Sequence, residues 1–466
     1  MLEIKREDHF DTSIDAQKTL LQKSWKPLLW ATSLLIIGGV LLALPARSQT
    51  IPQATAAARD KQREQQVNQT RPDRYDLSRY PVTDANERYW RNLLWSTAIT
   101  EPQLASVDAA IAQILSLTAR RNLSTAQGRT LEMAMQVGTQ LYLSNPAQYE
   151  GVKQQFLQTL ERSADAEWVA MAVSALMQGG ADAGQRSQWR DRIQQRFPQW
   201  RNHPALFTVL QTIETLDRPR VTPPLKDLLT WTIAPGQLQM YVICRPDRSV
   251  LCQAILKDRQ GQFIRQNGQL WSVPLLTRSL HGLSSVFTRG QTPQGIYRLE
   301  GSVPQPDTEF FRAYGTFSLV KLFVPFEPGV KAFLSNRPGQ IGGLSAYQSL
   351  LPPSWRNDFS IQQSYWAGKA GRGLFRVHGS GEAPTFFTNN SRYPDSAGWN
   401  PTIGCLSALE LYDQTGRLQQ ADMPKILSAL TAAGGQNFSG YLIVVEIPNQ
   451  PNPSISLQEI ENLIRK

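Results

Sequence analysis

Few residues in this chain are of types that carry out chemistry, and a lone cysteine stands out among them. It lies in the segment NPTIGCLSALELYD, residues 400–413, of a 466-residue chain that has only three cysteines and four histidines. A cysteine becomes a strong nucleophile when an imidazole lies close enough to accept the proton of its thiol. Cys405 is therefore a candidate nucleophile, and the alternatives are a small, buried apolar residue and one half of a disulfide.

Two histidines are candidates for the base. His378 ends a β-rich run in the segment FRVHGSG, and two strand ends joined by a loop can bring it close to Cys405. His281, in LHGLSS, also precedes a glycine and is the rival candidate. Gly404 lets the backbone next to the cysteine approach a ligand closely, and the N–H groups there can stabilise an oxyanion.

The elements that must position these residues change character along the chain, and the first large region is predicted to be helical. Between about residues 84 and 217, apolar residues recur at helical spacing, and Thr100 with Gln103 predicts a capping box. Further helices are expected near 124–143, 147–163, 165–178, 185–196 and 204–216. No candidate catalytic residue stands out in this region. Its expected role is to bind a protein or glycan partner.

The C-terminal half is predicted to be rich in β-structure. A proline-rich linker, 218–235, ends the helical region, and β-rich runs separated by glycine and proline then fill residues 236–450. The chain closes with a helix at 451–466, where Ser456 and Glu459 form a capping box.

An apolar segment near the N-terminus is predicted to be a transmembrane anchor. Residues 27–46 carry no charge and follow a lysine-containing leader, 1–26, which is expected to stay in the cytoplasm. The polar segment 47–83 is expected to be a flexible stalk. A signal peptide cleaved after Ala46 is the alternative. The expected localisation is therefore the cytoplasmic membrane, single-pass, with the catalytic part on the extracytoplasmic (periplasmic) side.

That location bears on the other two cysteines, because disulfides persist in an oxidising compartment. Cys244 and Cys252 lie on opposite arms of a predicted hairpin, and an odd-length loop centred on Arg248 places them opposite one another. A disulfide between them is expected. An even two-residue loop would instead place Cys252 opposite Ile243 and leave two small apolar strand residues.

Three ordered segments of the C-terminal half resemble the L,D-transpeptidase (YkuD-like) catalytic domain. They are TPQGIYRL at 292–299, RVHGSG at 376–381 and TIGCLSALELYD at 402–413. The resemblance covers the β-rich half and not the helical region or the anchor. It implies a β-rich fold whose cysteine attacks a peptidoglycan stem peptide between its third and fourth residues and releases a D-amino acid. The acyl group is then passed to an amine or to water.

The resemblance also implies a role for each matching residue. Cys405 is the nucleophile and His378 is the base. The carbonyl of Gly379 orients the imidazole. The amides of Gly404 and Cys405 supply the oxyanion hole. The Thr-Pro-Gln-Gly turn, 292–295, is structural and lies near the site.

Two positions depart from the family pattern. Ile403 stands where the family usually has a histidine, and Ser407 stands where it usually has an arginine near the substrate. Arg376 or Arg392 is the candidate cation in place of that arginine. Thr402 is a conservative replacement for a serine. The expected substrate-binding residues are therefore Thr402, Ser407 and Arg376.

The sequence thus predicts a multidomain protein with a single N-terminal transmembrane helix, an all-α helical array and a β-rich, L,D-transpeptidase-like catalytic domain. The expected function is a membrane-anchored cell-wall transpeptidase that acts on peptidoglycan stem peptides, without a cofactor, a metal or a nucleic-acid partner. The formal charge of +10 suits an anionic peptidoglycan sheet. The alternatives are a peptidoglycan-binding or scaffold protein with a degenerate site, and an unrelated thiol hydrolase.

Overall fold

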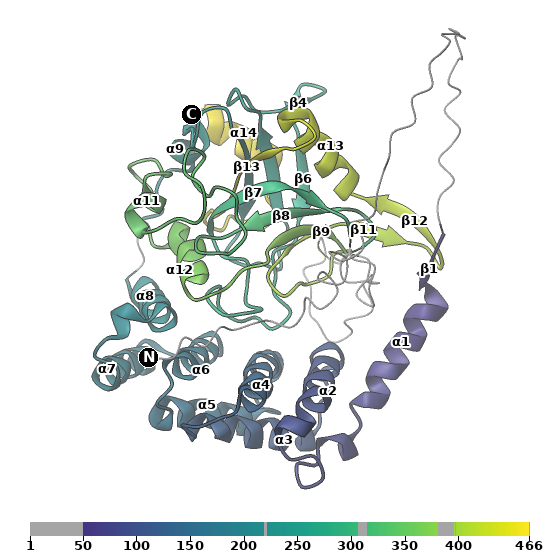
Figure 1. Ribbon diagram of the computed structural model, residues 1–466, viewed down its shortest axis with the longest axis vertical. Coiled ribbons are helices and arrows are strands. Elements are labelled where there is room, and N and C mark those ends of the chain that lie inside the picture. Colours follow the sequence, from purple (N-terminus) through teal and green to yellow (C-terminus); the bar gives the residue numbers. More distant parts are fainter. Residues whose placement is uncertain (1–49, 219–220, 306–314, 381–395, 397, 466) are drawn as a thin grey trace, which may run out of the picture. The chain divides into compact units, whose positions relative to one another are not determined.

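The computed structural model describes residues 50–218, 221–305, 315–380, 396 and 398–465 (Figure 1). The described residues belong to one unit of the chain, Ser48–Lys466. Within it, a helical N-terminal region is followed by a β-rich C-terminal region. The expected division of the folded part into helical and β-rich regions therefore agrees with the order of the elements.

The predicted transmembrane helix requires a correction. In the described ranges no helix combines the length and the apolar character that crossing a bilayer demands. The helix α4, Thr125–Ser144, has 20 residues but carries Arg129 and Glu132. This finding overturns the transmembrane helix in the predicted fold class, the membrane anchorage and the single-pass localisation in the cytoplasmic membrane. The segment that carried the prediction, 27–46, lies outside the described residues, as does the leader before it.

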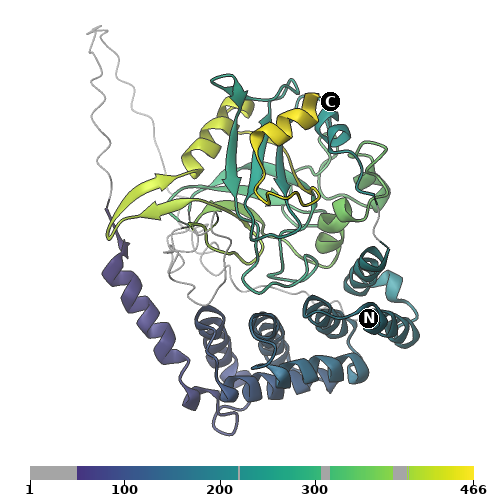
Figure 2. The same ribbon diagram turned by 180° about the vertical axis from the view of Figure 1, so that it is seen from behind.

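The segment expected to be a flexible stalk is folded from residue 50 onward. The strand β1, Thr50–Thr55, pairs antiparallel with β12, Thr415–Ala421, and the helix α1, Ala56–Gln69, follows it (Figure 2). Thr55 caps α1 by accepting a hydrogen bond from the N–H of Ala58. The partner strand comes from the far end of the chain, so the polar composition of the segment gave no sign of this pairing.

Amphipathic helices that share one hydrophobic core make up the helical array. They are α2 (Glu87–Thr100), α3 (Ala105–Leu115), α4, α5 (Glu150–Arg162), α6 (Ala166–Gln178), α7 (Ala183–Arg196) and α8 (Pro204–Asp217). Capping boxes start α4 at Ser124 and α7 at Asp182. The box predicted at Thr100 is wrong, because Thr100 is the last residue of α2 and Glu101 caps that helix in the left-handed conformation.

The β-rich region is built on an eight-stranded sheet in the order β10-β9-β8-β7-β13-β2-β3-β6. Its strands are β2 (Leu238–Cys244), β3 (Cys252–Lys257), β6 (Ser272–Leu275), β7 (Gly295–Val303), β8 (Leu319–Phe323), β9 (Arg376–Gly379), β10 (Leu406–Ala408) and β13 (Ser439–Glu446). The pairs β10–β9 and β13–β2 are parallel, and the other pairs are antiparallel. A bridge between Leu276, directly after β6, and Ser407 in β10 joins the two ends of the sheet.

Successive residues of the central strands enter different hydrophobic clusters, so both faces of the sheet are buried. In β2, for example, Tyr241 and Ile243 enter one cluster while Met240 and Val242 enter the other. The cluster of Met240 includes side chains from α13 (Met423–Gly434), and the cluster of Tyr241 includes side chains from α9 (Leu225–Thr230), α12 (Gln363–Lys369) and α14 (Leu457–Arg465). A rigid sheet therefore carries β9 and β10.

Short elements complete the fold. They are β4 (Arg265–Gln266), β5 (Gln269–Leu270), α11 (Leu344–Gln348) and β11 (Glu410–Tyr412), which joins β1 and β12 in a three-stranded sheet. The final helix, α14, starts after Ser456, whose hydroxyl accepts a hydrogen bond from the N–H of Glu459 at 3.1 Å.

Candidate active site

Cys405 and His378 lie on neighbouring strands of the main sheet. In the parallel pair β9–β10, Ser407 lies opposite His378, and Cys405 directly precedes β10. Val377 and Leu406 are buried in the core, so the alternation of side chains directs His378 and Ser407 to the opposite face. A residue two positions along the neighbouring strand is roughly 7–8 Å away between Cα atoms, within reach of an imidazole. The register therefore places the two residues on the same face of neighbouring strands, within reach of one another.

A backbone hydrogen bond fixes the imidazole of His378. Its Nδ1 lies 2.6 Å from the carbonyl oxygen of Gly379. A carbonyl can only accept, so Nδ1 carries the proton and Nε2 keeps the lone pair that a base needs. Burial and the Arg376 cation lower the pKa of His378 to about 4, against the opposing hydrogen bond to Gly379. At neutral pH the imidazole is thus an uncharged acceptor.

The thiol of Cys405 is half-buried and unpaired. Its Sγ lies 3.8 Å from the carbonyl oxygen of Leu374, to which the thiol donates. Burial raises the pKa of Cys405, whereas the cations Arg376 and Arg372 and a hydrogen bond from the Arg376 backbone oppose that rise. The resting pair is therefore a neutral thiol beside a neutral imidazole, and the proton must move as the sulfur attacks.

Leu374, whose carbonyl oxygen accepts the hydrogen bond of the resting thiol, has a strained backbone. Its φ is 62°, in the left-handed region that non-glycine residues seldom adopt, and its side chain is 62% exposed. Glu327, which is buried, holds it by accepting the N–H of Leu374 at 2.8 Å and the N–H of Val324 at 3.0 Å. The strain is thus maintained by a buried carboxyl group at the edge of the site.

The turn before the nucleophile is held by two threonines. The hydroxyl of Thr402 accepts from the N–H of Gly404 at 3.1 Å and donates to the carbonyl oxygen of Cys405 at 2.7 Å. The hydroxyl of Thr292 donates to the carbonyl oxygen of Gly404 at 2.9 Å. Gly404 has a φ of 125°, and a Cβ there would clash with the guanidinium of Arg372. Only glycine fits this turn.

This arrangement changes the expected oxyanion hole. The N–H of Gly404 is already donated to Thr402, so it is not free to bind an oxyanion. The N–H of Cys405 makes no hydrogen bond to another residue in the described part of the chain, and it remains the available donor. Thr402 therefore shapes the turn, and its predicted contact with a substrate stays a prediction.

Sequence reasoning missed Arg372, which lies beneath the cysteine turn. Its side chain is buried, and its guanidinium donates to the carbonyl oxygens of Ser285, Gly290 and Gln291. Burial lowers the pKa of Arg372 to about 10, although the nearby Tyr297 and Cys405 oppose that shift. The guanidinium therefore holds the loop before the Thr-Pro-Gln-Gly turn by hydrogen bonds and lies against Gly404 of the cysteine turn. Only its position between two glycines could have marked this arginine in the sequence.

The remaining predicted substrate residues occupy different environments. Arg376, the first residue of β9, is half-buried and donates from Nη1 to the carbonyl oxygen of Phe375 at 2.6 Å. Ser407 is fully buried, and its hydroxyl has no hydrogen-bond partner among the described residues. Ile403 is 38% exposed. Arg392 lies outside the described residues.

His281, the rival base, lies in a different environment from the thiol. It is fully buried, and its Nδ1 lies 3.0 Å from Oε1 of Gln140 in α4. Burial, and secondarily Arg289, lower the pKa of His281 to about 3. His378 is thus the histidine that the fold places beside Cys405.

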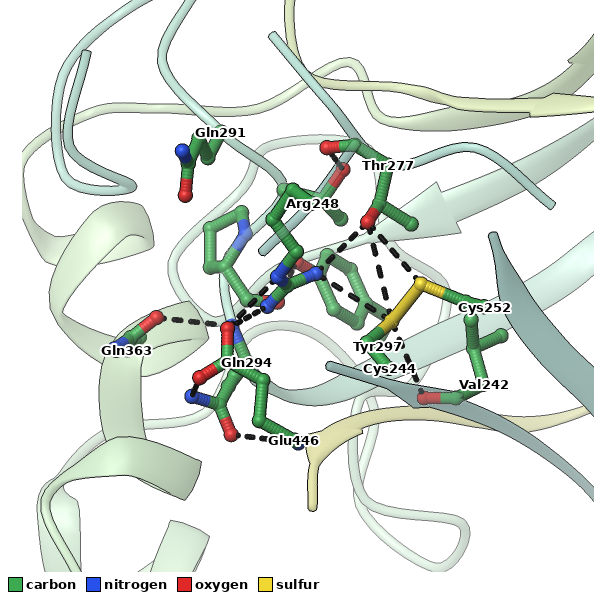
Figure 3. A network of polar contacts seen from close by, with 12 residues as sticks. Val242, Cys244, Arg248, Cys252, Thr277, Gln291, Gln294, Tyr297, Gln363 and Glu446 are labelled. Atoms are coloured by element: carbon green, nitrogen blue, oxygen red, sulfur yellow. Dashed lines mark hydrogen bonds and ion pairs between the residues drawn. A yellow bond between two sulfur atoms is a disulfide. The ribbon is translucent and has the colours of Figure 1, made fainter. Parts of the chain in front are cut away.

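Cys244 and Cys252 are joined by a disulfide next to Thr277 (Figure 3). Ile243 lies opposite Gln253, which is the register that the odd-length loop requires. The hydroxyl of Thr277 lies 3.3 Å from Sγ of Cys252. The disulfide therefore closes the hairpin that begins the β-rich region.

A buried ionic network next to this disulfide fixes the Thr-Pro-Gln-Gly turn (Figure 3). Arg248 donates to the hydroxyl of Thr277 at 2.9 Å and forms an ion pair of 2.7 Å with Glu446. Glu446 exchanges two hydrogen bonds, of 2.8 and 3.0 Å, with the side chain of Gln294 in the turn. The turn is therefore rigid where it supports the cysteine loop through Thr292.

A buried carboxyl group, which the sequence did not indicate, lies against the backbone next to His378. Glu410 is 1% exposed, and its Oε1 accepts hydrogen bonds from the hydroxyl of Tyr412 and the N–H of Thr316. A Cβ on Gly379 would clash with its Oε2, which has no partner among the described residues. Burial raises the pKa of Glu410 to about 7, although both hydrogen bonds oppose the shift.

We expect Glu410→Gln to flatten the pH dependence of stability. The pKa of Glu410 is higher in the folded than in the unfolded chain, so its contribution to stability is largest at low pH and is lost as the pH rises through about 7. Between pH 5 and pH 8 the free energy of unfolding of the wild type should fall by about 2–3 kcal/mol more than that of the variant. Urea unfolding at each pH measures the difference. The exposed Glu64→Gln is the control, and identical pH profiles for wild type and Glu410→Gln would contradict the expectation.

In the described ranges no cluster of histidine, cysteine, aspartate and glutamate side chains could hold a metal ion. Comparison of the chain with known protein families, with curated proteins and with solved structures finds no match. The geometry of the site and the motif resemblance therefore carry the functional argument.

Proposed function

We propose that this protein is a cysteine-nucleophile acyltransferase of the L,D-transpeptidase type that acts on peptidoglycan stem peptides. The observation that carries the proposal is the imidazole of His378, held through Nδ1 by the carbonyl of Gly379 on the strand next to Cys405. This arrangement leaves Nε2 unprotonated and on the same face of the sheet as the thiol. The substrate class comes from the resemblance of the three ordered motifs.

The first half of the reaction uses these groups in turn. As Sγ of Cys405 attacks the substrate carbonyl carbon, Nε2 of His378 takes the thiol proton. The negative charge develops on the carbonyl oxygen, where the N–H of Cys405 can stabilise it. When the C–N bond breaks, His378 returns the proton to the leaving amine, and a thioester on Cys405 remains.

The second half regenerates the enzyme. An acceptor amine, or water, attacks the thioester carbon while Nε2 of His378 takes one proton from it. The C–S bond then breaks, and His378 returns the proton to the sulfur of Cys405. Arg376, at the start of β9, supplies a positive charge near the thiol for a substrate carboxylate, in place of the arginine that Ser407 replaces.

The proposal is tested with a stem tetrapeptide that ends in a D-amino acid. We expect the purified full chain to release this amino acid and to gain the mass of the acyl group on Cys405. Cys405→Ala should do neither. The proposal fails if the wild type releases no D-amino acid or if Cys405→Ala releases as much.

One observation favours the second candidate, a peptidoglycan-binding or scaffold protein with a degenerate site. The N–H of Gly404 is committed to Thr402, so one of the two amides that the family pattern assigns to the oxyanion hole is occupied. A scaffold would retain peptidoglycan in a sedimentation assay while releasing no D-amino acid. The same tetrapeptide experiment therefore separates the two functions.

A further inference from the structure

Residues 278–291, which we call the support loop, connect β6 to the Thr-Pro-Gln-Gly turn. Four apolar side chains of this loop belong to the hydrophobic core of the helical array: Leu280, Leu283, Val286 and Phe287. Each is at most 5% exposed. The support loop therefore belongs to the β-rich region by connectivity but to the helical array by packing.

A buried amide joins the support loop to two helices. Oε1 of Gln140, in α4, lies 3.0 Å from Nδ1 of His281, and since the amide oxygen only accepts, Nδ1 carries the proton. Nε2 of Gln140 donates to the carbonyl oxygen of Ala98 at 2.7 Å and to the carboxyl of Glu101 at 2.6 Å. The side chain is only 5% exposed. All of its polar atoms are thus engaged between α2, α4 and the support loop.

The other side of the support loop holds the cysteine turn. The N–H of Leu280 donates to the carbonyl oxygen of Thr402 at 2.7 Å. The hydroxyl of Thr402 in turn donates to the carbonyl oxygen of Cys405 at 2.7 Å. Since His281 directly follows Leu280, an unbroken chain of contacts leads from Gln140 to Cys405.

We propose that Gln140 is a positioning residue for Cys405 and that the helical array is a structural support of the thiol site. Without the amide, the ring Nδ1–H of His281 is buried with no acceptor. This loss is costly enough to shift the support loop and, with it, Thr402. The positioning of the thiol does not depend on the proposed function. Only the reaction that the positioned thiol carries out rests on it. A helical array that only bound a partner would not need a buried amide that hydrogen-bonds to the support loop.

The test compares acylation of the full chain by a carbapenem in wild type and in Gln140→Met. We expect the limiting rate of adduct formation on Cys405 to fall about tenfold, while the half-saturating concentration stays the same. Thr139→Val is the matched control. Thr139 is the neighbouring residue of α4 and is fully buried, and its hydroxyl donates within the helix to the carbonyl oxygen of Met135. This control should react at the wild-type rate.

A second variant and a second probe keep the test decisive. If Gln140→Met does not fold, His281→Leu removes the same contact from the other side. Where both fold, the double variant should be no slower than either single one, because the two side chains act as a unit. Iodoacetamide supplies the second probe, since Cys405 is the one cysteine of the three outside the disulfide.

The outcomes separate this inference from the proposed function. We expect the alkylation rate of Cys405 to change at least about threefold in Gln140→Met and His281→Leu, and to stay unchanged in Thr139→Val. Wild type that forms no carbapenem adduct would overturn the proposed function but not the positioning. Alkylation and acylation rates within twofold of wild type in both folded variants would overturn the positioning.

Discussion

Replacement of His378 by glutamine should slow the acylation of Cys405 by about 10²–10⁴-fold. The imidazole is neutral at pH 7 because burial lowers the pKa of His378 to about 4, and its Nε2 is the acceptor for the thiol proton. Glutamine fills much of the same volume but is not a base. The thiol, whose own pKa is raised by burial, then has no group to take its proton. The rate of carbapenem adduct formation at pH 7, followed by intact mass, measures the loss.

The matched control for this prediction is His203→Gln. His203 lies in the helical region, directly before α8, and should not influence the thiol. A rate for His378→Gln within threefold of the wild-type rate would show that another group accepts the proton. The assignment of the base would then be wrong, whatever the role of Cys405.

Replacement of Arg372 by leucine should destabilise the fold by about 3–5 kcal/mol. The guanidinium donates to three carbonyl oxygens of the support loop, and leucine would leave all three buried without a donor. Urea unfolding measures the change in the free energy of unfolding. Arg372→Lys should recover only part of it, because an ammonium group cannot span the three acceptors.

An exposed arginine provides the comparison for Arg372. Arg120 lies on the surface, and its replacement by leucine should change the free energy of unfolding by less than about 0.5 kcal/mol. A loss below 1 kcal/mol in Arg372→Leu would contradict the role of the guanidinium in holding the support loop beside the cysteine turn.

Patterns within short segments predicted the elements of the fold well. The spacing of apolar residues in 124–143 and 204–216 located α4 and α8 to within two residues, because packing on one face imposes a helical period. The helix start predicted at Thr100 was wrong because threonine also occurs in the last turn of a helix, where Thr100 lies. The pairing of β1 with β12 was missed because its partner lies far away in the sequence.

In the candidate site, too, local features could be predicted from the sequence and contacts between distant segments could not. Cys405 and His378 could be proposed from residue type and motif order, and the register of β9 and β10 then placed them on one face. Arg372 and Glu410 could not, because their contacts exist only after distant segments pack together. The commitment of the Gly404 amide to a neighbouring side chain likewise depends on the conformation of the turn, which composition does not determine.

The central claim is that Cys405 is the nucleophile of an acyl-transfer site, and peptide mapping of a carbapenem adduct tests it most directly. The full-length wild type is incubated with the carbapenem, its intact mass is recorded, and the modified peptide is identified after digestion. We predict one adduct per chain, located at Cys405, and none on Cys405→Ala. An unmodified wild type, or an adduct of equal yield on Cys405→Ala, would contradict the claim.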